Sequence, residues 1–217
     1  MSALAGNPSI LPSVFSPAFW FLTLSLFSLH SLVMAAAPRP TARIIGIDPG
    51  LNLTGYGVVE CRADGVKLIE AGVIRLPRSQ GNNLPARLES LFNELRGVIR
   101  EFRPRAVCLE EIYSHSAFPL TSILMGHARG VICLIAQMEG IPLVSISAKR
   151  IKQSVTGNGN ASKLQVQRAV QNFFSLHRTP DPPDVADALA AALCYVNTLR
   201  AKVIKEKGKQ QRRGGMQ

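Results

Sequence analysis

The chain has 217 residues, of which 47% are hydrophobic, and it carries a formal net charge of +11 at pH 7. This length suits one domain with a complete core, plus appendages. The cysteines are far apart and have no metal-ligand spacing, which argues against a zinc-finger protein or a disulfide-stapled domain. We expect all of them to be small buried hydrophobic residues in a reducing compartment: Cys61, Cys108, Cys133 and Cys194.

The positive charge is unevenly distributed along the chain. Residues 200–217 contain seven Lys or Arg and one Glu, whereas residues 1–42 contain only Arg39. Residues 43–199 hold 17 basic and 13 acidic side chains, so this region is mildly basic. Such a balance permits nucleic-acid binding without proving it. We predict that residues 200–217 form a disordered basic tail that attracts phosphate regardless of sequence.

Residues 1–42 differ from the rest and are predicted to form an N-terminal extension. Residues 19–33 are uncharged and mostly apolar, but this run is shorter than the roughly 20 residues that a membrane span needs. It also lacks the basic start of a signal peptide. Translation from Met34, an export signal and a membrane anchor all stay open. We favour the first interpretation, which predicts a cytoplasmic protein and is tested by N-terminal sequencing.

Strands are predicted to dominate the segment after the extension. Residues 43–47 are apolar and β-branched, which indicates a buried strand. Asp48 ends this strand, and the Pro-Gly pair that follows favours a turn. Residues 56–59 are predicted to return as the antiparallel partner, and residues 66–76 to form a third strand.

Helices and strands are predicted to alternate through the remainder. The expected helices are 83–102, 120–139 (capped by Gly140), 148–155, 162–174 and a last helix from 181, with Asp181 as N-cap, to about 199. The expected strands are 105–112 and 141–146. Three antiparallel strands followed by parallel strands between helices predict a five-stranded mixed α/β sheet flanked by helices.

Four carboxylates stand out against this framework. Asp48 ends the first strand, Glu110 lies near the end of the fourth, and Asp184 and Asp187 share one face of the largely apolar last helix. A buried carboxylate needs a cation, and no Lys or Arg occurs between residues 178 and 200. Oxygen ligands with few histidines suit Mg²⁺ or Mn²⁺, and a pair of such ions can drive phosphodiester hydrolysis.

A structural explanation of the same acids stays open at this point. Asp184 in a first helical turn is favoured by the helix dipole alone, and Glu110 could be a salt-bridge partner.

The acids belong to an ordered set of motifs, which spans about residues 43–199: Gly46-Ile47-Asp48-Pro49-Gly50, Thr54-Gly55-Tyr56-Gly57, Leu109-Glu110-Glu111, Gly126-His127-Ala128-Arg129-Gly130-Val131 and Asp184-Val185-Ala186-Asp187-Ala188-Leu189-Ala190. In this order and spacing they resemble the RuvC family of bacterial Holliday junction resolvases. The resemblance implies an RNase H-like fold and a nuclease domain over residues 43–199. It also implies a homodimer that resolves four-way DNA junctions by paired, symmetric Mg²⁺-dependent cuts in recombination and repair.

Site residues follow from the same resemblance. The family's four catalytic, metal-binding positions fall on Asp48, Glu110, Asp184 and Asp187, which implies two Mg²⁺ ions per site with Mn²⁺ able to substitute. Lys152 and Lys163 match lysines near the scissile strand, although either could simply be a solvated helix end. Tyr113 matches an aromatic residue that stacks on a base at the crossover, although it could instead pack at a strand end.

The family also implies a RuvA–RuvB branch-migration motor as partner and no small-molecule substrate. The loop from 114 to 125 contains no Lys or Arg, so its DNA contacts and the preferred cleavage sequence are not predicted.

Other classes of protein share parts of this pattern. An actin- or Hsp70-like ATPase also has Gly-x-Asp before a glycine, but it needs a second phosphate loop that is missing here. A junction-binding protein that does not cut would be hindered by acids near phosphate. An RNase H-like nuclease with another nucleic-acid substrate stays open.

Overall fold

The computed structural model describes residues 41–50, 52–76, 83–111 and 119–214. Internal contacts divide the chain into Met1–Pro40 and Thr41–Gln217, and all the described residues lie in the second unit. None of the helices in the described ranges combines the length and hydropathy that crossing a membrane requires.

A mixed five-stranded sheet with the order β3-β2-β1-β4-β5 lies at the centre of this unit. β1 (Ala42–Asp48), β2 (Leu53–Cys61) and β3 (Val66–Arg75) form an antiparallel meander. β4 (Ala106–Glu110) pairs with β1 in parallel, and β5 (Leu143–Ile146) pairs with β4 in parallel. The predicted fold class is therefore confirmed, with strand ends that differ by a few residues.

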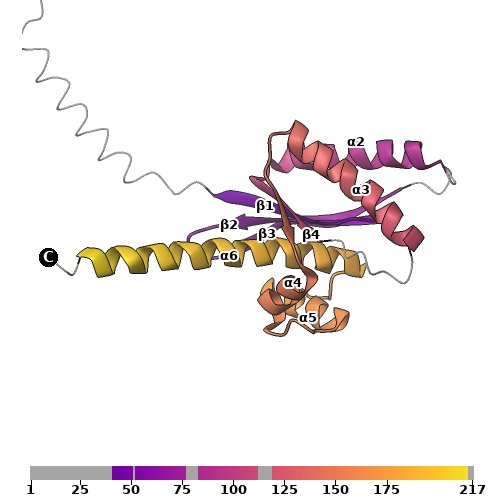
Figure 1. The fold of residues 1–217 in the computed structure, drawn as a ribbon. Coiled ribbons are helices and arrows are strands. Elements are labelled where there is room, and N and C mark those ends of the chain that lie inside the picture. Colours follow the sequence, from indigo (N-terminus) through magenta and orange to yellow (C-terminus); the bar gives the residue numbers. More distant parts are fainter. Residues whose placement is uncertain (1–40, 51, 77–82, 112–118, 215–217) are drawn as a thin grey trace, which may run out of the picture. The chain divides into compact units, whose positions relative to one another are not determined.

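Helices cover both faces of the sheet (Figure 1). α2 (Leu84–Phe102) and α3 (Pro119–Met138) lie on one face, where α2 buries Leu91, Leu95 and Ile99. The other face carries α4 (Ala148–Thr156), α5 (Lys163–Phe173) and α6 (Pro183–Gly214).

The central strand alternates between these two cores, as the two-residue period of a strand requires. Ile45 and Ile47 pack in the core with α2 and α3, whereas Ile44 packs in the core that contains α6. Asp48 has the parity of Ile44, so it belongs to the α6 face of the sheet.

Two glycines allow α6 to lie directly on the sheet. A Cβ at Gly46 of β1 would collide with the backbone carbonyl of Ala188, and one at Gly55 of β2 would collide with the carbonyl of Asp184. Helix backbone therefore replaces side chains at these two positions. Gly46 of the first motif and Gly55 of the second thus allow α6 to pack closely on the sheet. This packing brings the start of α6 to the end of β1.

The last helix differs from the sequence prediction at both ends. It begins at Pro183, so Pro182 rather than Asp181 precedes it, and the Pro182 carbonyl accepts a hydrogen bond from the Val185 amide at 3.1 Å. It continues to Gly214, so the expected end near residue 199 and the expected disorder of residues 200–214 are wrong. Good helix formers follow Arg200 and no proline interrupts them, so local propensity extends the helix beyond the core.

The thiols also differ in part from the prediction. Cys108 and Cys194 are buried and Cys61 is partly buried, but Cys133 of α3 is exposed. The apolar neighbours of Cys133 indicated burial, yet the residue lies on the face of α3 turned away from the sheet.

Candidate active site

The parallel pairing of β1 and β4 brings two of the predicted acids together. Ile47 lies beside Leu109 in this pairing, so Asp48 and Glu110 follow at neighbouring strand ends. Adjacent strands are about 4.8 Å apart, which places both carboxylates at the same edge of the sheet. Asp48 and Glu110 are both partly buried, which makes a charge on either one costly.

The first turn of α6 adds the other two acids. Gly55 pairs with Asp48 across β1 and β2, and the backbone of Asp184 lies directly against Gly55. Asp187 follows almost one helical turn later and presents its side chain on the same face. Four carboxylates that are distant in the sequence therefore meet at one edge of the sheet, as the sequence predicted.

The pKa values of Asp48 and Glu110 are shifted by burial and by the neighbouring acids. Burial, followed by the negative charges of Asp187, Asp184 and Glu110, raises the pKa of Asp48 to about 7. Burial and the charge of Asp187 also raise the pKa of Glu110, although Lys152 and Lys163 oppose that shift. The cluster therefore holds more negative charge than its own surroundings neutralise.

Lys163 at the start of α5, which the family resemblance placed near the scissile strand, is also a direct partner of the acidic cluster, and the sequence did not predict this pairing. Its Nζ lies 3.0 Å from Asp187 Oδ2. Burial lowers the pKa of Lys163, but the hydrogen bond that its ammonium donates to Asp187 and the charges of Asp187, Asp184 and Asp48 outweigh it, so the net shift is upward. The search for a basic partner within α6 overlooked Lys163 because it comes from another helix.

A cavity of about 200 Å³ opens beside the cluster. Its lining includes Glu110, Asp187, Lys152 and Lys163, so two acids and two bases of the predicted site share one space. Lys152 comes from α4 and Lys163 from α5, and the short turn between these helices sets their spacing.

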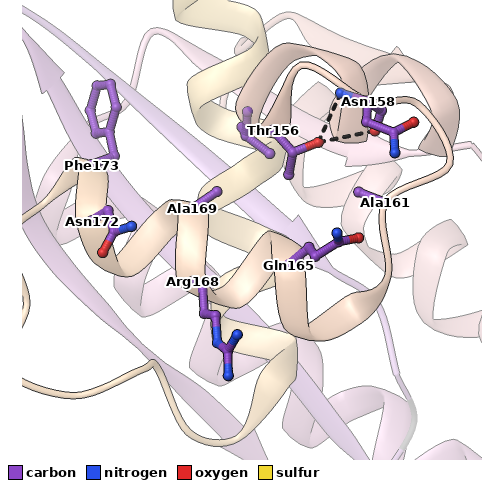
Figure 2. Close-up of a pocket in the computed structure, with 9 residues that line it drawn as sticks. Thr156, Asn158, Ala161, Gln165, Arg168, Ala169, Asn172 and Phe173 are labelled. Carbon is purple, nitrogen blue, oxygen red and sulfur yellow. Dashed lines mark hydrogen bonds between the residues drawn. The ribbon is translucent and has the colours of Figure 1, made fainter.

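That turn is fixed by its own hydrogen bonds. The Thr156 hydroxyl accepts a hydrogen bond from the Asn158 amide at 3.1 Å and donates one to the Asn158 carbonyl at 3.0 Å. Dashed lines mark both bonds in Figure 2. Gly157 adopts φ 75°, and a Cβ at Gly159 would crowd the side chain of Lys149. On the far side of the turn, Ser162 and Gln165 form a capping box at the start of α5. Both lysines are thus carried by an ordered helical hairpin.

Arg129 of α3 is a second residue whose role was not predicted. Its Nη1 donates to the carbonyl of Glu110 at 2.7 Å, and its Nη2 donates to Ser145 Oγ at 2.6 Å. The guanidinium therefore holds the ends of β4 and β5 together where β4 presents Glu110. Arg129 lies in the motif over residues 126–131, but nothing in the local sequence pattern indicated this contact.

Comparison with known proteins identifies the family. The family model described as "Crossover junction endodeoxyribonuclease RuvC" matches residues 44–195. The chain belongs to the RuvC family. The match ends within α6, so the last part of that helix lies beyond it.

Individual RuvC proteins are similar over the same region. The crossover junction endodeoxyribonuclease RuvC of Rhodopirellula baltica is 45% identical over 162 residues, which cover 75% of this chain and 90% of that protein. The Syntrophomonas wolfei protein of the same name is 39% identical over 158 residues, 73% of this chain and 90% of the relative. The structure of Thermus thermophilus RuvC in complex with a Holliday junction substrate is 28% identical, with a TM-score of 0.67, and covers 74% of this chain and 96% of that one.

The RuvC family is metal-dependent, and the donor chemistry of this cluster fits a hard divalent cation. All four predicted ligands are carboxylates, which suit Mg²⁺ or Mn²⁺, and the neighbouring acids, which add to the effect of burial on the pKa of Asp48, supply negative charge that such a cation would neutralise. Among the described residues, however, no three His, Cys, Asp or Glu side chains are already arranged to hold an ion. Lys163 instead contacts Asp187.

The remaining predicted site residue is Tyr113. It lies outside the described residues, as does most of the loop from 114 to 125.

Proposed function

We propose that this chain is a structure-specific endonuclease that resolves four-way DNA junctions by paired, symmetric phosphodiester hydrolysis during recombination and repair. One observation carries the proposal. Four acids from β1, β4 and α6 lie together at one edge of the sheet, beside two lysines: Asp48, Glu110, Asp184 and Asp187. Two acids and two bases that line one small cavity, with the other two acids beside them, suit a phosphodiester better than an uncharged substrate. No small-molecule substrate is proposed.

The four carboxylates are the proposed metal ligands and catalytic residues. We propose two Mg²⁺ ions, with Mn²⁺ able to substitute, because a cluster of carboxylates with a raised Asp48 pKa gains most from concentrated positive charge. When bound, such ions activate a water molecule and stabilise the leaving oxygen.

Lys152 and Lys163 are proposed to attract and orient the scissile phosphate. Each opposes the raised pKa of Glu110, so both ammonium groups act at the acidic cluster. Lys163 is about half exposed, which leaves its ammonium able to turn from Asp187 to a phosphate oxygen. Tyr113 is proposed to stack on a base at the crossover, where stacking contributes about 1–3 kcal/mol.

A homodimer is proposed through the outer face of α3. Ile123, Leu134 and Met138 are 57%, 53% and 52% exposed on this helix. Gly126 and Gly130 are also exposed, and a Cβ at either would meet nothing within 4 Å in this chain. Apolar side chains beside two small residues form a surface on which a second helix can pack closely. Paired, symmetric cuts require two active sites related by a two-fold axis, which a homodimer provides.

Two further expectations rest on the family resemblance. They are association with a RuvA–RuvB branch-migration motor and a cytoplasmic location, with residues 1–42 as an N-terminal extension.

A cleavage assay tests the proposal. Purified full-length protein is incubated with a synthetic four-way junction or with linear duplex of the same sequence, in Mg²⁺, in Mn²⁺ or in EDTA. We expect paired nicks in the junction only, with either metal and not with EDTA. Cutting of linear duplex or of an RNA–DNA hybrid in preference to the junction would instead assign an RNase H-like nuclease with another substrate.

A further inference from the structure

A second cleft lies between α4 and the outer half of α6. It has a volume of about 430 Å³, and its lining comprises Arg150, Gln153, Ser154, Cys194, Asn197, Thr198, Ala201, Lys202 and Lys205. Three of these side chains are cationic and none is acidic. Most of the α6 part of the lining follows residue 195, where the match to the family model ends.

The polar walls of the cleft are held in place while its cations stay available. Arg150 Nη2 donates to Thr198 Oγ1 at 3.1 Å, and Asn197 Nδ2 donates to Ser154 Oγ at 3.1 Å. These two bonds tie α4 to α6. Among the residues that the structure describes, no acidic side chain forms an ion pair with Arg150, Lys202 or Lys205. An anion would therefore meet three uncompensated positive charges there.

The position of the cleft along α6 relates it to the acidic cluster. Lys205 follows Asp187 by about five helical turns, which returns it to the same face roughly 27 Å further along the axis. α4 supplies a cation to each place: Lys152 lines the cavity beside the cluster, and Arg150 lines the cleft. Figure 1 shows α6 running from the edge of the sheet past α4.

We propose that this cleft binds the phosphate backbone of a junction arm, away from the point of cutting. This inference rests on the proposed function. Duplex DNA advances about 3.4 Å per base pair, so a phosphate held by Lys205, at the far end of the cleft, belongs to a nucleotide roughly eight base pairs from the one at the acidic cluster. The contact would extend the footprint of the enzyme along the arm, and it would not depend on base sequence because only phosphate is bound.

The test removes the two lysines of the cleft and varies the length of the arm. The variant Lys202→Gln with Lys205→Gln keeps good helix formers at exposed positions, so circular dichroism should be unchanged. Its control, Arg103→Gln with Arg105→Gln, removes the same charge from exposed residues at and just after the end of α2, which lies on the other face of the sheet. Binding is measured by fluorescence anisotropy in EDTA over a range of salt concentrations. The junctions carry arms of about 20 or about 6 base pairs, lengths chosen around the span derived above.

On long arms, the cleft variant should bind roughly 10-fold more weakly than the native chain. The slope of log Kd against log salt should also fall by up to about 2, because each phosphate contact contributes about 0.9. On short arms the two proteins should bind alike, and the control should match the native chain on both. An equal loss on both arm lengths, a loss no larger than that of the control, or no loss would overturn the proposal.

Failure of the proposed function would be seen separately. Native protein in Mg²⁺ that cuts neither junction would refute the nuclease assignment. The cleft would then be judged on linear duplexes of about 20 and about 6 base pairs, the lengths derived above, where the same long-duplex loss supports phosphate binding and its absence rejects it.

Discussion

Lys163 Nζ lies 3.0 Å from Asp187 Oδ2, so a base from α5 enters a cluster of acids from β1, β4 and α6. The ammonium provides the only positive charge that the described residues pair directly with these four acids. In the metal-free protein it relieves part of their repulsion. When a substrate phosphate arrives, the same group can hold it against the cluster.

Lys163→Ala is therefore expected to slow junction cutting by roughly 10-fold or more, because a charge aimed at the reacting phosphate is lost. Folding should be nearly unaffected, since a half-exposed ion pair contributes about 1 kcal/mol or less. Single-turnover cleavage at saturating Mg²⁺ measures the effect, with Lys67→Ala as an exposed-lysine control. A variant that cuts at the native rate would remove Lys163 from the site.

Asp48→Asn is expected to abolish cutting while leaving junction binding largely intact. Asparagine keeps the size of the side chain but removes its charge, so a divalent ion is held poorly at the end of β1. The loss should exceed the roughly 10–100-fold that follows removal of an outer-shell partner of a metal. Cleavage and gel-shift assays on the same preparation separate the two effects, and normal cutting by the variant would disprove the assigned role.

The stability of the metal-free protein should depend on pH through Asp48. Its pKa is about 7 in the folded chain against an ordinary value of 3.8, so the folded state binds this proton more tightly. Stability should therefore fall as pH rises from about 4 to about 7, by at most about 4 kcal/mol, and level off for this group above that range. Asp48→Asn should remove the dependence, and Mg²⁺ should suppress it. Urea unfolding in EDTA at several pH values checks this, and parallel curves for both proteins would contradict it.

Arg129→Gln is expected to lower both stability and the cleavage rate. Glutamine cannot reproduce the two short bonds from Arg129 to the Glu110 carbonyl and to Ser145, so the ends of β4 and β5 lose their clamp. Loss of hydrogen bonds to a charged group costs about 1.5–3 kcal/mol each. A role in positioning Glu110 predicts a raised Mg²⁺ concentration for half-maximal cutting. A change in stability with an unchanged metal dependence would leave Arg129 a purely structural residue.

Leu134→Glu on α3 should convert the proposed dimer to a monomer. The substitution places a charge on a side chain that is 53% exposed and outside the buried core, so the isolated fold should tolerate it. Multi-angle light scattering measures the mass, and Glu94→Gln, an exposed residue of α2, serves as the control. Native protein that is monomeric with and without DNA would contradict the proposed interface.

Local pattern alone determined much of this protein. The apolar, β-branched run before Asp48 predicted the central strand, and the spacing of Leu91, Leu95 and Ile99 predicted the buried face of α2, because burial imposes a fixed period on each type of element. The order of the motifs indicated the family and the four acids. Helix propensity also extends α6 beyond residue 199, where the basic composition misleadingly suggested disorder.

Only the tertiary structure decided which distant groups meet. Gly46 lies within the predicted first strand and Gly55 just before the predicted second one, but nothing local indicated that they allow α6 to rest on the sheet. Lys163 and Arg129 reach the site from helices whose local periodicity says nothing about their partners. The reason is physical: period and propensity act between near neighbours in the chain, whereas charge neutralisation and close packing depend on contacts that form only when the whole unit folds.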